Sequence, residues 1–288
     1  MVVSSNSLLP VFGFQKTSLI DYPGQAASVI YLGGCNLRCR YCHNRDLVLM
    51  KGERQSLDLI VAWLKSNAVK HLVITGGEPG LYIDSPEFET FLYELSSLYI
   101  NLKLDTNGTL FSVEKMMNTR TGGPVARVLR YVAIDYKAPE SIWCDRTGAS
   151  TEALSQFIAN RDYILMVNHS RFVQNSFCFG EMRTTVHASL LTKDDIRAIA
   201  SELDSNYDSE RTTPWYLQQY RQCEGFDPTL KDEPTYSNEE LADLACEVGA
   251  FVRGVPDELA TKAADALFER MKSKLGITKD KFYNLFLM

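Results

Sequence analysis

Short apolar runs recur along the chain, and most are followed by a segment in which apolar residues return every three or four positions. Runs of this length predict buried strands, whereas the longer spacing predicts amphipathic helices. After Ser56, for example, Ile60 and Leu64 fall on one helical face. The predicted strands cover residues 27–32, 71–75, 101–105, 131–137, 182–186, 215–219 and 249–253.

This alternation of strands and helices predicts a parallel sheet built from right-handed crossovers. Two helix starts carry capping boxes, Thr192 with Asp195 in a weaker form and Ser237 with Glu240. Six or seven strand–helix units are too few for a closed eight-stranded barrel. We therefore predict an α/β fold, a partial (β/α)6-type open TIM barrel with a C-terminal helical extension.

The C-terminal part of the chain predicts one amphipathic helix that starts near Pro256 and stops at Gly276. Its apolar positions are Leu259, Ala263, Leu267, Met271 and Leu275. We expect this helix to pack over one end of the sheet. The predicted division is a barrel over residues 1–254 and a helical extension over 255–288, while residues 144–179 give no clear pattern.

Composition narrows the classes of protein. The chain has 288 residues, of which 45% are hydrophobic and 23% charged, as in a soluble globular protein. A formal charge of -6 argues against a basic nucleic-acid surface. No apolar run approaches the roughly 20 residues that cross a bilayer, and no basic residue precedes Lys16, so neither a membrane span nor a secretory signal is expected. Seven cysteines without a framework pattern fit a reducing cytoplasm.

Three of these cysteines, Cys35, Cys39 and Cys42, are crowded on one predicted loop. Thiolates are soft ligands that suit zinc or an iron–sulfur cluster. A closed zinc site needs four ligands, and His43, directly after Cys42, is poorly placed to supply the fourth. Three thiolates on a cubane cluster would instead leave one iron open to a substrate, which is the interpretation we favour. The remaining cysteines are each alone in sequence: Cys144, Cys178, Cys223 and Cys246.

Charged side chains occupy the carboxyl ends of several predicted strands, where buried strands are usually apolar. They are Lys103, Asp105, Asp135, Lys137 and Arg183, followed by His187. Buried charges are normally paired, solvated or bound to a ligand. Because carboxyl strand ends form the active-site mouth of α/β barrels, we expect these groups to line a site. A structural ion-pair network, for instance Asp105 with Lys137, is the alternative.

The second predicted strand ends in Gly76-Gly77-Glu78. The glycines allow close backbone approach to a ligand, and Glu78 can accept hydrogen bonds from an ammonium group. One crossover after a three-cysteine loop, this tripeptide indicates a binding site.

The spacing Cys35-x-x-x-Cys39-x-x-Cys42 resembles the motif of the radical S-adenosylmethionine (SAM) superfamily. More narrowly, the chain resembles glycyl-radical-enzyme activating proteins of the anaerobic ribonucleoside-triphosphate reductase type. The segments that carry the closer resemblance are residues 13–24, 39–44, 75–79, 104–108, 135–139 and 183–186.

The resemblance implies a [4Fe–4S] cluster on the three cysteines, with its fourth iron chelated by the amino and carboxylate groups of SAM. Tyr41 would lie against this cofactor and the backbone of His43 would touch its adenine. The amino group would meet Gly77 and Glu78, and the carboxylate would be held directly or through a monovalent cation. The candidate cofactor-binding residues are Tyr41, His43, Gly76, Gly77, Glu78, Asp105, Thr106, Asp135, Lys137 and Arg183.

The resemblance also implies reductive cleavage of SAM to a 5′-deoxyadenosyl radical, with electrons from a flavodoxin- or ferredoxin-type donor. In an activase, this radical takes the Cα hydrogen of a glycine on a partner such as anaerobic ribonucleotide reductase. Two alternatives stay open. One is a radical SAM enzyme that acts on a small molecule or nucleotide, such as a deazapurine precursor. The other is a non-catalytic iron–sulfur or zinc protein that senses redox state.

Overall fold

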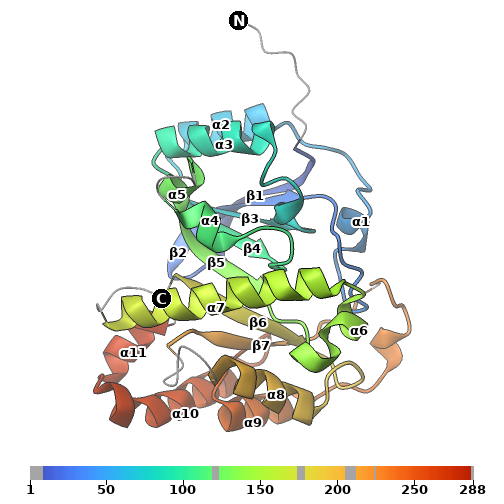
Figure 1. The fold of residues 1–288 in the computed structure, drawn as a ribbon, viewed down its shortest axis with the longest axis vertical. Coiled ribbons are helices and arrows are strands. Elements are labelled where there is room, and N and C mark those ends of the chain that lie inside the picture. The colour runs from blue at the N-terminus through green and yellow to red at the C-terminus, as the bar shows by residue number, and fades with distance from the viewer. Residues whose placement is uncertain (1–8, 119–122, 174–178, 205–211, 224, 287–288) are drawn as a thin grey trace, which may run out of the picture. The chain divides into compact units, whose positions relative to one another are not determined.

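The computed structural model describes residues 9–118, 123–173, 179–204, 212–223 and 225–286. Its eight strands form a sheet in the chain order β1 to β8 (Figure 1). The chain divides into two compact units, which share strand β5 (Leu129–Asp135). Unit 1 holds residues 1–36, 44–106 and 110–132, and unit 2 holds residues 37–43, 107–109 and 133–288.

Unit 1 is built on strands β1 (Val11–Tyr22), β2 (Gln25–Leu32), β3 (His71–Gly76) and β4 (Asn101–Thr106). Strand β1 is antiparallel to β2, whereas β2, β3 and β4 pair in parallel. Strands β2 and β3 carry apolar runs at their centres, as expected of strands covered on both faces, whereas β4 includes the buried Lys103 and Asp105. Unit 1 also contains α1 (Arg45–Val48), α2 (Leu57–Ser66), η1 (Pro79–Leu81), α3 (Pro86–Ser97), α4 (Val113–Met117) and α5 (Val125–Val128).

Unit 2 carries strands β6 (Gly180–Val186), β7 (Trp215–Gln219) and β8 (Phe251–Arg253), which pair in parallel. Its longer helices are α7 (Thr151–Val173), α8 (Lys193–Asp204), α9 (Asn238–Val248), α10 (Asp257–Leu275) and α11 (Lys279–Phe286). Shorter turns are η2 (Glu140–Ile142), α6 (Trp143–Thr147) and η3 (Leu230–Asp232). Helices α8, α9 and α10 lie side by side in this unit (Figure 1).

The strand order and the intervening helices are those of a partial (β/α) barrel, so the predicted α/β fold is confirmed. Helix α10 confirms the predicted C-terminal helix, and Gly276 ends it in the left-handed conformation at φ 60°. Ala263, Leu267 and Met271 are buried, whereas the side chain of Leu275 lies outside the described residues. None of the described helices is long and apolar enough to cross a bilayer.

Several elements differ from the prediction. Strand β1 was not predicted, because only three of its twelve residues are buried and its pairing with β2 is interrupted by register shifts. Helix α7 fills much of the stretch without a clear pattern, and its apolar residues do not form one stripe. Strand β5 stops at Asp135, so Lys137 lies in the loop beyond it. Strand β8 starts two residues late because Gly249 ends helix α9.

Helix α11 was also not predicted. Its Phe282 is fully buried and contacts Phe251, with ring centroids 6.0 Å apart. Phe251 is the first residue of β8, so this helix packs at the amino end of that strand. The contact between Phe282 and Phe251 is therefore away from the carboxyl ends of the strands, where the candidate site residues of unit 2 lie.

Candidate active site

In unit 1 the loop after β3 lies directly on the loop that leads to Cys35. The Gly77 amide donates to the Leu32 carbonyl at 2.9 Å, and the Glu78 amide donates to the Gly34 carbonyl at 2.8 Å. A Cβ atom on Gly77 would come within 1.8 Å of the Gly34 oxygen and 3.3 Å of the Cys35 Cβ. Glycine is therefore required here by a backbone contact, and that contact sets Cys35 beside Glu78.

Gly76 has a second, independent reason to be glycine. Its φ of 125° is one that L side chains rarely adopt, and its Cβ would fall 2.3 Å from the Leu32 carbonyl oxygen. Close approach of a ligand to the two glycines stays a prediction. The structure shows that both approach the neighbouring strand and loop.

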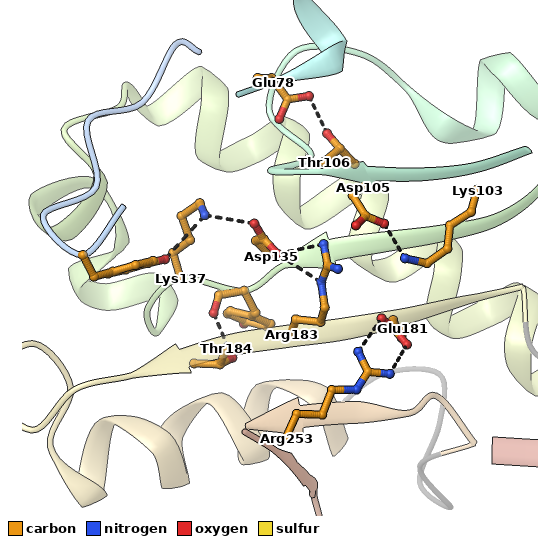
Figure 2. A network of polar contacts seen from close by, with 12 residues as sticks. Glu78, Lys103, Asp105, Thr106, Asp135, Lys137, Glu181, Arg183, Thr184 and Arg253 are labelled. Carbon is orange, nitrogen blue, oxygen red and sulfur yellow. Dashed lines mark hydrogen bonds and ion pairs between the residues drawn. The ribbon is translucent and has the colours of Figure 1, made fainter. Parts of the chain in front are cut away.

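The carboxylate of Glu78 is fully buried at the end of β3. Its Oε1 accepts from the Gly80 amide at 2.8 Å and from the Thr106 hydroxyl at 2.6 Å (Figure 2). Thr106, the last residue of β4, is itself buried. These two donors fix the orientation of an acidic group that the fold has removed from water, and they unite two predicted site residues, Glu78 and Thr106.

Asp105 forms an ion pair with Lys103, two residues earlier on β4 (Figure 2). Their charged atoms lie 2.5 Å apart, and only 2% of Lys103 and 9% of Asp105 is exposed. Burial raises the pKa of the nearby Tyr31 hydroxyl, and the charges of Asp21 and Asp105 add to this effect. The sequence placed Lys103 and Asp105 on one face but did not indicate that they pair with each other.

In unit 2, Asp135 joins two cations at the end of β5 (Figure 2). Its Oδ2 lies 3.3 Å from the Lys137 ammonium, and its Oδ1 lies 3.2 Å from both Nε and Nη2 of Arg183. Lys137 Nζ also donates to the Tyr41 hydroxyl at 3.4 Å and lies 5.7 Å from the ring centroid. The structure thus brings together four residues that the sequence nominated separately.

Burial is the main reason why the pKa of Tyr41 is raised, while the Lys137 charge opposes the shift. For His43, burial and then Arg221 lower the pKa, against an opposing effect of Asp135. Tyr41 is therefore a neutral hydrogen-bonding group at physiological pH. His43 is biased toward the neutral imidazole.

The cysteine loop is shared between the units: Cys35 belongs to unit 1, and Cys39 and Cys42 belong to unit 2. None of the three forms a disulfide. Within unit 2 the Cys42 amide donates to the Cys39 carbonyl at 3.1 Å, which closes a tight turn, and Cys39 is buried. Among the described residues, no three His, Cys, Asp or Glu side chains form a ready-made metal site. As a donor set, three thiols on one loop suit an iron–sulfur cluster.

Sequence reasoning also did not find the ion pair between Arg253 and the buried Glu181 in unit 2. Arg253 of β8 makes two 3.0 Å contacts with the buried Glu181 of β6, and its guanidinium carbon lies 3.4 Å from the Tyr216 ring centroid (Figure 2). Glu181 lies two residues before Arg183 and so shares its face. The two-residue spacing from Arg183 was the signal in the sequence that could have indicated Glu181.

Residues 29–155 match the family model described as Radical SAM superfamily. This segment contains the three cysteines, the Gly-Gly-Glu loop, Asp135 and Lys137. This part of the chain is therefore similar to radical SAM domains. Arg183, Glu181 and Arg253 lie outside the matched segment.

One relative is a Methanocaldococcus jannaschii protein, provisionally named a glycyl-radical enzyme activating enzyme. It is 27% identical over 90% of this chain and 98% of that protein. A 7-carboxy-7-deazaguanine synthase of Aquifex aeolicus is 36% identical over 41% of this chain and 52% of that enzyme. Among solved structures, Streptococcus suis SuiB covers 75% of this chain and 44% of its own, with 15% identity and a TM-score of 0.49.

Proposed function

We propose that the protein is a radical SAM enzyme that holds a [4Fe–4S] cluster on Cys35, Cys39 and Cys42 and cleaves SAM reductively. The observation that carries this proposal is the three-cysteine loop within the matched family segment. Polar groups at the strand ends support it. A buried carboxylate follows β3, and two cations share one carboxylate after β5. The second group suits recognition of an anionic ligand.

We assign the charged amino and carboxylate groups of SAM to residues of opposite charge. Glu78, held by Thr106 and the Gly80 amide, accepts hydrogen bonds from the amino group of the SAM methionine. Lys137 and Arg183 attract its carboxylate, and Asp135 keeps these two cations apart and oriented. Asp105, which is paired with the buried Lys103, belongs to the same proposal as a residue that holds the methionyl carboxylate directly or through a monovalent cation. Tyr41 is held through Lys137 and offers its ring to the cofactor.

A cluster held by Cys35, Cys39 and Cys42 would provide the electron for cleavage of the C5′–S bond of SAM, which would yield methionine and a 5′-deoxyadenosyl radical. The protein's task is orientation, because such a radical attacks most nearby C–H bonds. The buried Glu78 and the paired Lys137 provide fixed rather than mobile contacts for this purpose.

We propose that the hydrogen comes from the Cα of a glycine on a partner glycyl radical enzyme. The nearly full-length similarity to the Methanocaldococcus jannaschii protein supports this assignment. Reconstituted protein, SAM, a flavodoxin- or ferredoxin-type donor and a candidate partner should give a glycyl doublet in electron paramagnetic resonance spectra. Anaerobic ribonucleotide reductase is the first partner to test.

A second candidate function is supported by the higher identity of the shorter match to a 7-carboxy-7-deazaguanine synthase. In that case the substrate is a nucleotide-like small molecule. Formation of 7-carboxy-7-deazaguanine, with no glycyl doublet on any partner, would favour this candidate.

Reductive cleavage of SAM is common to both candidate functions, and it can be tested without a partner protein. Anaerobically reconstituted protein with dithionite and SAM should release 5′-deoxyadenosine, and absence of release would refute the proposal. Replacement of Cys39 by alanine should abolish both cluster incorporation and release. Cys246→Ala is the matched control, because Cys246 lies on helix α9, where its Sγ is 4.0 Å from the Lys262 carbonyl oxygen. A colourless protein that binds zinc would indicate a redox-sensing role instead.

A further inference from the structure

Residues 37–43 are the part of the cysteine loop that belongs to unit 2. They are contacted by a segment almost two hundred positions later in the chain. We name residues 225–233 the strap. Arg40 Nε donates to Asp227 Oδ2 at 2.6 Å, and Arg40 Nη2 lies 3.3 Å from Glu233 Oε1. One arginine between two cysteine ligands is therefore held by two carboxylates of the strap.

The backbones of the two segments also touch. The Asp227 amide donates to the Arg40 carbonyl at 3.3 Å. Gly225 is buried, and a Cβ on it would come 3.0 Å from the Cys42 carbonyl and 3.2 Å from the Arg40 carbonyl. A larger residue would require the two backbones to move apart by a few tenths of an ångström. The backbone contacts thus extend from Arg40 to Cys42 and add to those of the Arg40 side chain.

The strap is itself internally braced. Asp227 Oδ1 accepts from the Thr229 amide at 3.0 Å and from its hydroxyl at 2.6 Å. Leu230 is fully buried in a cluster with Leu190 and Tyr220, and Tyr41 of the cysteine loop packs against this cluster. Hydrogen bonds from Thr229 and then from Arg40 lower the pKa of Asp227 to about 2, so Asp227 is ionised at neutral pH.

We propose that the strap positions the cysteine loop, with Arg40 and Asp227 as its positioning residues. The inference rests on the proposed function, in which this loop binds the cluster. An unrestrained loop loses about 1–2 kcal/mol per residue of conformational freedom when it is ordered. A loop that is already held presents Cys39 and Cys42 without that cost, and it releases bound iron more slowly.

The Arg40 pairs are partly exposed, and exposed pairs contribute little to global stability. We therefore expect Arg40→Ala to loosen the loop and leave global unfolding nearly unchanged. The matched control is Arg197→Ala. Arg197 is similarly exposed and pairs with Asp194 and Glu247, away from the cysteine loop.

The decisive measurement uses the full-length, cluster-free protein. Cys39 is buried, so its alkylation by N-ethylmaleimide, followed by peptide mass spectrometry, reports opening of the loop. In Arg40→Ala we expect this rate to rise about fivefold or more, with Cys246 as an internal reference. Asp227→Ala, which acts from the strap side, should give a similar rise, and the double variant should add little. Arg197→Ala should match the wild type.

In the reconstituted protein, iron release to a chelator should accelerate in the same two variants. Equal Cys39 alkylation in Arg40→Ala, Asp227→Ala and the wild type would overturn the strap proposal and leave the proposed function standing. Failure of the wild type to bind a cluster would refute the function, yet the alkylation rates would still test the strap. The two failures are therefore distinguishable.

Discussion

The Gly34 carbonyl oxygen occupies the position in which a side chain on Gly77 would begin, because a Cβ there would lie 1.8 Å away. We predict that Gly77→Ala displaces the loop that leads to Cys35. Neither partner is a flexible side-chain end, so relief requires backbone movement. We expect a loss of about 1–3 kcal/mol in the free energy of unfolding, measured by urea denaturation.

Gly148→Ala is the control for this variant. Gly148 has a φ of 70°, but a Cβ on it would meet nothing within 4 Å. Its cost should be confined to the left-handed backbone, about 1–2 kcal/mol, without effect on cluster incorporation. Normal cluster content in Gly77→Ala would contradict the role given to this contact.

Glu78→Gln tests the amino-group contact. Glutamine retains an oxygen that can accept from Gly80 and Thr106, so the fold should change little. It loses the charge that attracts an ammonium group. We expect SAM to bind about 10- to 100-fold more weakly, as measured by equilibrium dialysis of the reconstituted protein. Glu89→Gln, on the exposed face of α3, should bind SAM as the wild type does.

Lys137→Met tests the carboxylate contact. Methionine keeps most of the length of the chain but removes the ammonium that lies 3.3 Å from Asp135. Asp135 would then face only Arg183 of its two cations, and the net charge offered to an anion would fall by one. We expect at least about a tenfold loss of SAM affinity. Lys193→Met removes an exposed ammonium of unit 2, and unchanged affinity in both variants would contradict the assignment.

The parts of the fold that could be predicted are those with a local cause. Leu72, Val73 and Ile74 form a continuous apolar run because β3 is covered on both faces, and each is almost fully buried. The capping box of Ser237 and Glu240 is written within four residues, and both of its hydrogen bonds are present. Strand β1 has no such local pattern, because it is an edge strand that can be recognised only from its pairing with β2.

The same distinction between local and long-range causes applies to the residues of the candidate site. The spacing of Cys35, Cys39 and Cys42 is enough to identify them as candidate ligands. The alternation of side chains along a strand places Lys103 and Asp105 on the same face. The choice of partner is a different matter. Arg40 contacts Asp227 across 187 positions, and nothing near Arg40 in the sequence distinguishes it from a solvated arginine. Contacts of this kind follow from the packing of β7 and its following loop, which no local pattern encodes.

The last prediction concerns pH. His187 is 1% exposed at the end of β6, where its Nδ1 accepts from the Ser189 amide and contacts the Ser189 hydroxyl at 2.7 Å. Burial is the main cause that lowers its pKa. The groups that modify this effect are the Leu230 carbonyl and Glu233, which raise the pKa, and Arg40, which lowers it, while the Tyr220 ring packs edge-on.

Because the folded pKa lies below the usual value of about 6.5, the unfolded chain binds a proton first as pH falls. The stability due to neutral His187 is thus complete above about pH 6.5 and is lost as pH falls through the folded pKa. The contribution to the slope is at most about 1.4 kcal/mol per pH unit. His187→Asn, whose oxygen can take the place of Nδ1 beside Ser189, should flatten the pH dependence of urea unfolding between pH 7 and 5 relative to the wild type. Parallel curves for the two proteins would show that His187 is protonated equally in the folded and unfolded states.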